Sequence, residues 1–417
     1  MNTPTTSDLA DLDLFAAGPP WAAFAALRRD DPVHWNPERD GRGFWSVTRH
    51  ADIVAISRDA ETYTSELFTN LEEVDDPVRR ELRRSMLETD GPRHRALRKL
   101  LQRDFTPRQV NQRYEGFLRG LTRVTVEAAL AKPEFDFVTE IAADFPIRVL
   151  ARMLGVPDED TPKLIEWGNR IIGNTDPDYA DVLLETPESL KYQDLPFRSP
   201  ASLEVFAYGD RLAAERRGGD GDDLVSKLVN TLPEDGRPLS PEHFHNYFLL
   251  LVVAGNETTR HAISHAMLAL IEHPEELAKL RRDPGLIPGA VEEFLRWASP
   301  VYHFRRTATR DVELHGRHIR EGDKVVLWFA SGNRDETVFA EPGRFDVTRA
   351  NVDHLTFGKG GPHFCLGASL ARLELRLMFE ELLPRLSHVE LAGEVTRVRS
   401  NFVNGIKRLP VRITRQG

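Results

Sequence analysis

The chain has 417 residues, of which 41% are hydrophobic and 29% are charged, and this composition excludes a disordered or collagen-like protein. Asp and Glu number 65 against 55 Lys and Arg, so the net charge of −10 argues against nucleic-acid binding, which normally requires a basic excess. The single cysteine excludes an internal disulfide and a zinc site built on paired cysteines.

Residues 1–20 are acidic and polar and lack the basic start and apolar core of a signal peptide, so we expect a cytoplasmic protein in which residues 1–20 form a flexible arm. The longest apolar run, residues 247–254, is far shorter than the about 20 residues that a membrane helix needs. Neither an internal repeat nor a Pro/Gly/Ser-rich linker divides the chain. We therefore predict a single domain over residues 1–417 with no membrane span.

The N-terminal half alternates between a short strand signal and amphipathic helices. Residues 43–50 show the alternation of a strand. Apolar residues at helical spacing predict helices over 94–105 and 144–154, the first stopped by Pro107 and the second by Gly155. Residues 176–201 carry few helical signals, and we expect them to form a mobile lid.

The longest predicted helix covers residues 240–272. Ser240 is a favourable N-cap, and the helix would be about 50 Å long at 1.5 Å per residue, enough to cross the domain. Its residues 248–254 are apolar on nearly all sides, which is typical of a helix buried at the centre of a domain.

The C-terminal part combines strands with one further helix. Residues 311–319 and 324–329 have strand patterns, and a helical pattern follows Gly367. Asn404-Gly405 is a strong signal for a tight hairpin. The sequence therefore predicts a mainly α fold with small β-sheets gathered to one side, in the α+β class.

Cys365 stands between a glycine-rich loop and this last helix. Free N–H groups and the positive end of the helix dipole favour a thiolate there, and the glycines allow a close approach to the sulfur. The alternative is a buried, inert cysteine in a turn. A phosphate-binding loop is a weaker reading, because no Ser or Thr follows Lys359.

The segment AGNETTR, residues 254–260, places polar groups inside the buried helix. A glycine there costs about 1 kcal/mol relative to alanine, and an acid is costly unless it is paired. Thr258 can bond back to a carbonyl one turn earlier and bend the helix. Glu257 and Thr258 could then relay protons to a buried acceptor. The alternative is a tight helix crossing in which Glu257 pairs with a structural arginine.

Glu293 and Arg296 lie three residues apart on a predicted helix and can form an ion pair, although this spacing alone is typical of surface pairs. The order of the motifs is more informative. The chain resembles the haem-thiolate monooxygenases, the cytochromes P-450, over nearly its whole length. AGNETT is similar to the family's oxygen-activation stretch, Glu293–Arg296 to its Glu-x-x-Arg, residues 333–349 to its meander, and HFCLG to its haem-ligand loop.

This resemblance implies the fold, the cofactor and several site residues. The fold would be that of a cytochrome P-450, with the long central helix over a buried haem b, and Cys365 would be the thiolate ligand of the iron, which favours O–O cleavage. Glu257 and Thr258 would deliver protons, and Arg344 would complete the network of Glu293 and Arg296. The residues expected to bind the haem are His94, Arg98, Arg306, His363, Cys365 and Gly367.

Two details of the resemblance concern the pocket. Phe357 lies eight residues before Cys365, one more than in the commonest family loop, as in bacterial members that oxidise sterol or terpenoid chains. Whether Phe357 packs on the haem is therefore open. We interpret Arg305 as a surface charge and His303 as either a substrate contact or a structural residue. The expected pocket consists of the loop before His94 together with Leu250, Val253, Ala254, Tyr302 and His303.

The implied reaction is hydroxylation of a largely apolar small molecule with O2 as co-substrate. The substrate would be a free terpenoid, steroid or fatty chain, or alternatively an acyl or aminoacyl group on a carrier protein. Because the chain contains no flavin or iron–sulfur segment, an NAD(P)H-driven ferredoxin reductase and a ferredoxin are implied. The expected ferredoxin-docking patch is Arg95, Lys99, Lys359, Arg372 and Arg376. A non-catalytic haem sensor is the alternative, which would need no proton relay.

Overall fold

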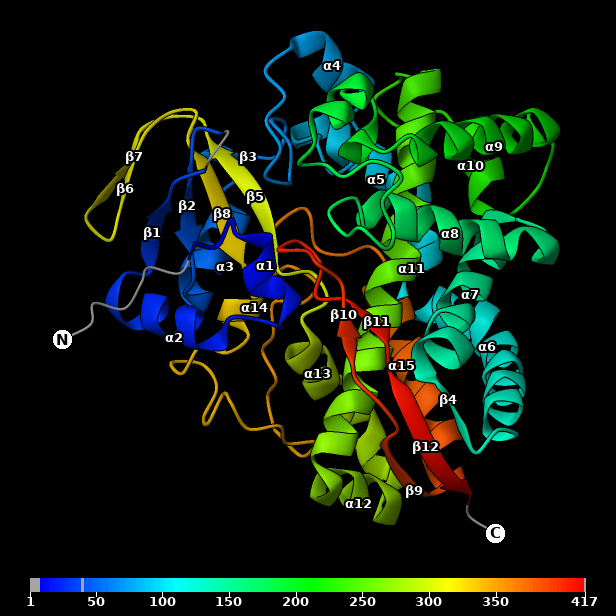
Figure 1. The fold of residues 1–417 in the computed structure, drawn as a ribbon. Coiled ribbons are helices and arrows are strands. Elements are labelled where there is room, and N and C mark those ends of the chain that lie inside the picture. Colours follow the sequence, from blue (N-terminus) through cyan, green and yellow to red (C-terminus); the bar gives the residue numbers. More distant parts are fainter. Residues whose placement is uncertain (1–7, 39–40, 416–417) are drawn as a thin grey trace.

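The structure, a computed structural model, describes residues 8–38 and 41–415. A helical part surrounds one long central helix, and a smaller part built on a five-stranded sheet lies beside it (Figure 1). The α-helices are α1 Leu12–Ala16, α2 Trp21–Asp30, α3 His50–Arg58, α4 Pro77–Leu82, α5 Gly91–Gln102, α6 Pro107–Leu130, α7 Asp144–Leu154, α8 Thr161–Ile172, α9 Ala201–Arg216, α10 Leu224–Asn230, α11 Pro241–Glu272, α12 Pro274–Arg282, α13 Ile287–Ala298, α14 Phe329–Gly332 and α15 Ala368–Leu382.

The strands form one larger sheet and three smaller ones. They are β1 Val33–Asn36, β2 Phe44–Val47, β3 Tyr63–Thr64, β4 Glu134–Asp136, β5 His303–Ala308, β6 Val312–Leu314, β7 Arg317–Ile319, β8 Lys324–Trp328, β9 Leu386–Leu391, β10 Thr396–Arg397, β11 Ile406–Arg408 and β12 Pro410–Arg415. The larger sheet has the order β1-β2-β8-β5-β3, with β2 and β8 parallel and the other pairs antiparallel. The sheet β4-β12-β9 lies apart from it, beside α6 and α12, so the sheets are not all gathered to one side (Figure 1).

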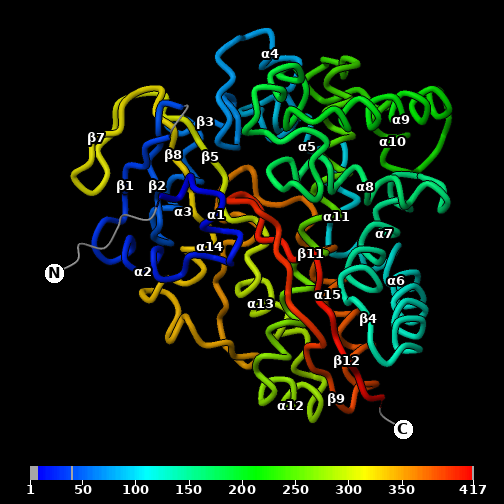
Figure 2. The backbone as a smooth tube through the Cα atoms, viewed as in Figure 1, coloured from blue at the N-terminus to red at the C-terminus, as the bar shows by residue number. Residues whose placement is uncertain are grey.

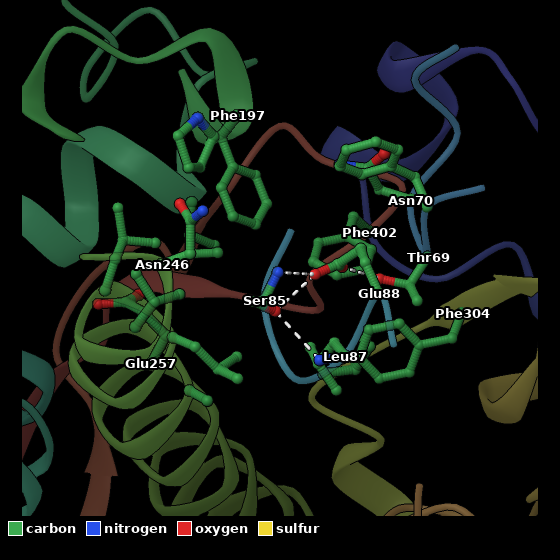
Figure 3. Close-up of a pocket in the computed structure, with 18 of the residues that line it drawn as sticks. Thr69, Asn70, Ser85, Leu87, Glu88, Phe197, Asn246, Glu257, Phe304 and Phe402 are labelled. Atoms are coloured by element: carbon green, nitrogen blue, oxygen red, sulfur yellow. Dashed lines mark hydrogen bonds between the residues drawn. The ribbon is translucent and has the colours of Figure 1, made fainter. Parts of the chain in front are cut away.

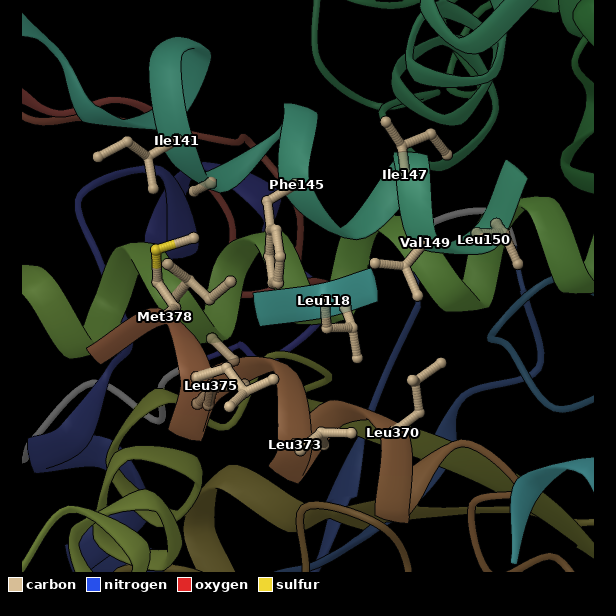
Figure 4. Close-up of a cluster of buried hydrophobic side chains, with 14 of the residues drawn as sticks. Leu118, Ile141, Phe145, Ile147, Val149, Leu150, Leu370, Leu373, Leu375 and Met378 are labelled. Carbon is tan, nitrogen blue, oxygen red and sulfur yellow. The ribbon is translucent and has the colours of Figure 1, made fainter. Parts of the chain in front are cut away.

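The central helix α11 is buried where the sequence predicted it. Ser240 caps it by accepting a hydrogen bond from the His243 N–H at 3.2 Å. Apolar side chains of α6, α7 and α15, including Leu118, Phe145 and Met378, pack together beside it (Figure 4). Each such buried side chain contributes about 1.5–3 kcal/mol relative to exposure. The mainly α, α+β prediction is confirmed.

The helices predicted over 94–105 and 144–154 are also present. They are α5, extended to Phe105 by a 3₁₀ turn, and α7, which ends at the left-handed Gly155 (φ 70°). Pro107 begins α6, so it separates two helices rather than entering a loop. None of the helices within the described ranges combines the length and the apolar character that crossing a membrane requires.

Two expectations differ from the structure. Residues 8–20 of the predicted flexible arm are packed, since Leu9 is fully buried and Phe15 stacks on Trp328 at 5.8 Å; residues 1–7 lie outside the described part. Asn404-Gly405 does not form a two-residue hairpin turn. Instead β10 pairs with β11 across the longer loop 398–405, and the Asn404 amide donates to the Ala298 carbonyl at 2.6 Å.

The C-terminal segment brings distant parts of the chain together. Figure 2 shows it running from the small sheet along the central helix. The Tyr302 N–H donates to the Phe402 carbonyl at 2.8 Å, and Val301 forms a bridge with Val403. The segment thus links the start of β5 to α11, which places both next to the cavity described below.

Candidate active site

A cavity of about 1660 Å³ lies between α11, α5, β5 and the loop before α15. Thr258 and Ala254 of α11 line one wall, and Cys365 lies on the wall formed by the glycine-rich loop. All six residues expected at the haem line this cavity: His94, Arg98, Arg306, His363, Cys365 and Gly367.

The loop before Cys365 is held by backbone contacts that require glycine. Gly358 and Gly360 have backbone φ values of 68° and 79°, which residues other than glycine rarely adopt. A Cβ on Gly361 would lie 1.9 Å from the Ser57 carbonyl oxygen, so the loop rests directly against the end of α3. The longer loop is therefore accommodated without moving Cys365 from the cavity.

Phe357 lines the cavity in spite of the extra residue. Its carbonyl accepts a hydrogen bond from the Cys365 N–H at 2.8 Å, and the Arg372 guanidinium lies over its ring at 4.6 Å. The phenylalanine therefore forms part of the wall next to the sulfur.

The Cys365 thiol is not a thiolate through its helix alone. Burial raises its pKa, and this outweighs the opposing effects of the Gly367 and Ala368 N–H groups and of Arg98. The N–H groups at the start of the helix do favour the thiolate, as expected, but desolvation of the charged form is the larger effect. A metal ion bound to the sulfur would reverse the balance, since a coordinating thiol loses its proton.

Basic and N–H-bearing side chains gather on the same cavity wall, and one of them, His94, lacks any hydrogen-bond partner in the described part of the chain. His94 is 1% exposed, and neither of its ring nitrogens has a hydrogen-bond partner among the described residues. Its ring lies 4.3 Å from that of His363, which contacts Asp90 at 2.8 Å. Desolvation lowers the pKa of the buried Arg306 to about 10, so it remains charged. This set fits a group with anionic arms, and hence the propionates of a haem whose iron faces Cys365.

A second cavity of about 840 Å³ continues from the first along α11 (Figure 3). Its wall is mostly apolar and includes the expected residues Leu250, Val253 and Ala254. The loop before His94 also contributes, through Ser85 and Leu87. A chamber of this kind accepts a largely apolar molecule and leads it toward Thr258.

Tyr302 and His303 do not line either cavity, so their assignment to the pocket is wrong. The Tyr302 hydroxyl donates to Asn404 Oδ1 at 3.0 Å, and the His303 ring packs on Trp328 at 4.7 Å. Both side chains point into the β part, where both are buried. Their neighbours Val301 and Phe304 line the cavities instead.

On α11, Glu257 and Thr258 have different hydrogen-bonding partners. Thr258 Oγ1 donates to the Ala254 carbonyl at 2.9 Å, as the sequence predicted, and lines both cavities. Glu257 is buried and forms an ion pair with Arg260. Burial would raise the pKa of Glu257, but Arg260 and His261 outweigh it and hold the pKa below its usual value. The structural-arginine alternative thus describes the position of the carboxylate.

Glu293 and Arg296 form a fully buried ion pair, with Nε–Oε2 and Nη2–Oε1 distances of 2.6 and 2.7 Å. Arg344 does not complete it through its side chain, which pairs with Glu341 at the surface. Arg349 takes that place, with its Nε 3.2 Å from Glu293 Oε2. Arg344 contributes its carbonyl, which accepts from Arg296 and Arg349.

Sequence reasoning missed two buried residues. Glu374 lines the first cavity, and burial raises its pKa well above the usual value. Its position between Arg372 and Arg376 suggested the surface, but it lies on the opposite face of α15. Arg305 is 2% exposed and donates to the Glu72 carbonyl at 2.9 Å, so the surface interpretation is wrong. Neither position carries a signal in the linear sequence beyond its neighbours.

The expected basic patch is partly neutralised. Arg372 forms two hydrogen bonds with Glu292, at 2.7 and 2.9 Å. Arg376, Lys359 and Lys99 also have acidic partners, which are Glu115, Asp353 and Glu234. Arg95 is exposed, and Phe364, next to Cys365, is 41% exposed.

Comparisons with known proteins agree with this geometry. The family model for cytochrome P450 matches residues 73–284 and 286–411. The chain is 37% identical to a steroid C26-monooxygenase of Rhodococcus jostii, covering 98% of this chain and 85% of that one, and 40% identical to a methyl-branched lipid omega-hydroxylase of Mycobacterium tuberculosis, covering 93% and 90%. A solved Mycobacterium marinum cytochrome P450 in complex with pseudoionone matches with a TM-score of 0.87 and 39% identity, covering 99% of both chains.

Proposed function

Since this chain belongs to the cytochrome P450 family, we propose that Cys365 is the thiolate ligand of its haem iron. The protein is a haem b monooxygenase that hydroxylates a largely apolar substrate with O2. Bound haem supplies the iron at which O2 is activated, and an axial thiolate favours cleavage of the O–O bond. The observation that carries the assignment is the cavity that is lined by this sulfur together with Arg98, Arg306 and the unpartnered His94.

The remaining residues of the cavity hold the cofactor and move protons. His94, Arg98, Arg306 and His363 would bind the two propionates, because a buried carboxylate needs cations or N–H donors. Thr258 would hold a proton path at the cavity wall. Glu257, which also lines the second cavity, would supply protons to it once its carboxylate leaves Arg260.

The substrate would be a free lipophile that is oxidised near a chain end. The chamber wall beyond Thr258 is apolar and includes Phe197, Val253 and Phe402, which gives an extended apolar molecule contact along its length. The similar proteins named above act at C26 of a steroid and at the omega position of a methyl-branched lipid, which are chain ends.

Electrons would come from a ferredoxin and its reductase. The exposed ring of Phe364 lies beside Cys365, and Arg98 of α5 is close enough to the sulfur to influence its pKa. Arg95 and Lys99 of the same helix are exposed and basic, which suits an acidic donor.

The test of the ligand is spectroscopic. We expect the reduced protein with carbon monoxide to show the red-shifted Soret band of a thiolate-bound haem, and Cys365→Ser to lose it. Retention of the band in Cys365→Ser would remove Cys365 from this role.

The test of the substrate class uses the spin state of the haem. Steroids, methyl-branched fatty acids and terpenoids should shift it at micromolar concentration. If acyl groups attached to a carrier protein shift it and the free molecules do not, the free-lipophile proposal is wrong.

A further inference from the structure

A buried histidine, His261, lies one helical turn after Glu257 and contacts its carboxylate. Its Nε2 is 3.5 Å from Glu257 Oε2, while its Nδ1 accepts a hydrogen bond from the Ile406 N–H at 3.3 Å. A neutral imidazole whose Nδ1 accepts must carry its proton on Nε2. Burial and Arg260 lower the pKa of His261, so the ring is neutral at physiological pH and presents an N–H to the carboxylate.

The position of this ring is fixed by the C-terminal segment. A Cβ on Gly405 would lie 2.9 Å from His261 Nε2, so the ring is wedged between α11 and the backbone before β11. One turn further along α11, His265 Nε2 contacts the Asn404 carbonyl at 3.0 Å. Both histidines therefore fasten α11 to the same segment, but the recorded contact with Glu257 belongs to His261.

Glu257 has three neighbouring donors, namely Arg260, His261 and the Asn256 amide, whose Nδ2 donates to Oε1 at 3.2 Å. Arg260 is a permanent cation that also donates to Asn169 Oδ1 at 2.7 Å, and its Nη2 lies 3.4 Å from His261 Nε2. Two N–H groups cannot bond each other, so the acceptor left beside the His261 Nε2–H is Glu257 Oε2 at 3.5 Å. The carboxylate is turned toward α8, where a Cβ on Gly168 would lie 2.9 Å from its Oε1.

Other charged or titratable groups surround this cluster from every neighbouring element. Burial raises the pKa of Tyr179, so it stays neutral, and Asp176 is paired with Lys407. The groups near Glu257 and His261 are Arg260 and His265 of α11, Tyr179 and Asp176 of the segment after α8, Arg397 of β10 and Lys407 of β11.

We propose that His261 is a positioning residue for proton delivery, whose Nε2–H keeps hold of the Glu257 carboxylate while it exchanges between Arg260 and the Thr258 side of α11. This inference rests on the proposed role of Glu257, which also lines the second cavity (Figure 3). Asn256 donates to Oε1, so without His261 the Oε2 atom would have Arg260 as its side-chain partner and would lose it on moving, which is costly for a buried charge. The neutral donor provides a partner during the exchange.

The test compares His261→Leu, which removes the donor, with His261→Asn, which retains an N–H. His265→Leu is the matched control, because it removes a buried ring that fastens the same segment without touching Glu257. Product formed per NADPH is measured against pH with the holoenzyme and a surrogate ferredoxin system. We expect an about five-fold loss in His261→Leu, the factor that one hydrogen bond represents. In the wild type His261 lowers the pKa of Glu257. Its removal should let that pKa rise, so we also expect the pH profile of His261→Leu to move toward higher pH. His261→Asn and His265→Leu should resemble the wild type.

Two further measurements separate the outcomes. Ring-¹⁵N histidine labelling, with the His261 signal identified by its loss in His261→Asn, should show the proton on Nε2; a proton on Nδ1 would overturn the inference even if His261→Leu loses its haem. Glu257→Gln tests the function on which the inference rests. If it uncouples the enzyme while His261→Leu behaves like His265→Leu, the inference about His261 fails alone. If Glu257→Gln stays coupled, the role of Glu257 and that of His261 fall together.

Discussion

At the scale of single residues, the helix α11 offers one side chain that can be tested without disturbing the fold. Thr258 faces both cavities and is bonded back to its own helix, so its hydroxyl is available to a proton path but does not support α11. We expect Thr258→Ala to bind substrate normally and to release more peroxide per NADPH consumed.

The matched control for this change lies on the same helix. Ser264 makes the same bond, to the Arg260 carbonyl at 2.8 Å, but borders neither cavity. Ser264→Ala should leave the coupling of NADPH to product unchanged. Equal peroxide yields from the two variants would count against the role of Thr258, since both then report only the lost helix bond.

Glu374 makes a second residue-scale prediction, about stability and pH. Its folded-state pKa is raised, so below about pH 4.3, the pKa of an unfolded glutamate, both states are protonated and its contribution is fully present. As pH rises, the unfolded state ionises first, and stability is lost at up to about 1.4 kcal/mol per pH unit until the folded group ionises. Glu374→Gln should remove this dependence.

The measurement is urea denaturation of wild type and Glu374→Gln at several pH values above 4.3, with the exposed Glu394→Gln as the control. The free energy of unfolding of the wild type minus that of Glu374→Gln should fall as pH rises. The same difference for Glu394→Gln should stay constant. A flat difference for Glu374 would mean that the carboxyl is ionised in the folded state.

Single residues also show where sequence reasoning stops. The residues expected to bind the haem were predicted from the family's motifs, and all of them line the same cavity. Tyr302 and His303 were misplaced because the direction of a side chain depends on tertiary packing. Tyr302 and His303 turn toward Asn404 and Trp328, partners that are distant in the sequence.

At the scale of elements, the chain after α14 is held to α13 by buried charge. Arg349 Nε contacts Glu293, and its Nη atoms reach the carbonyls of Ala340, Glu341 and Arg344. The sequence predicted Arg344 for this place, and the prediction was wrong because the turn between Arg344 and Arg349 brings the side chain of Arg349 to Glu293 and leaves that of Arg344 at the surface. We expect Arg349→Ala to lower the free energy of unfolding by about 1.5–3 kcal/mol, the cost of losing hydrogen bonds to a buried charge.

Arg344→Ala is the natural comparison. It removes an exposed side chain and keeps the carbonyl that Arg296 and Arg349 use. The free energy of unfolding and the haem content of Arg344→Ala should equal those of the wild type. If Arg344→Ala is the more damaging variant in denaturant titrations, the assignment of the network is wrong.

The prediction of elements succeeded where local signals agree. Ser240, the apolar run after it and the stop at Gly155 each act within one helix, and α7 and α11 appear where they were expected. It failed for Asn404-Gly405 and for residues 8–20, because there a tertiary contact decides. Asn404 forms hydrogen bonds with Ala298 and Tyr302, and the ring of Phe15 stacks on Trp328 of β8.

At the scale of the whole molecule, the net charge of −10 conceals an uneven distribution. The residues around Cys365 are basic, but the structure shows that Arg372 supports the Phe357 loop through Glu292, so changing it would disturb the site itself. Arg95 and Lys99 of α5 are exposed and do not line the cavity. They are therefore the residues with which to test docking of the electron donor.

We expect Arg95→Glu combined with Lys99→Glu to slow reduction by an acidic ferredoxin about ten-fold or more at low salt, because steering depends on the local field. The difference from wild type should shrink as salt shortens the Debye length to about 8 Å and below. Substrate-induced spin-state spectra should be unchanged, since both side chains lie outside the two cavities. Arg320→Glu, an exposed change on the loop between β7 and β8, alters the net charge without altering this face and should reduce normally. Arg320→Glu changes the net charge by two units and the α5 variant by four, so a stopped-flow response about half as large for Arg320→Glu would show that only total charge matters. Reduction insensitive to salt would place the donor on another surface.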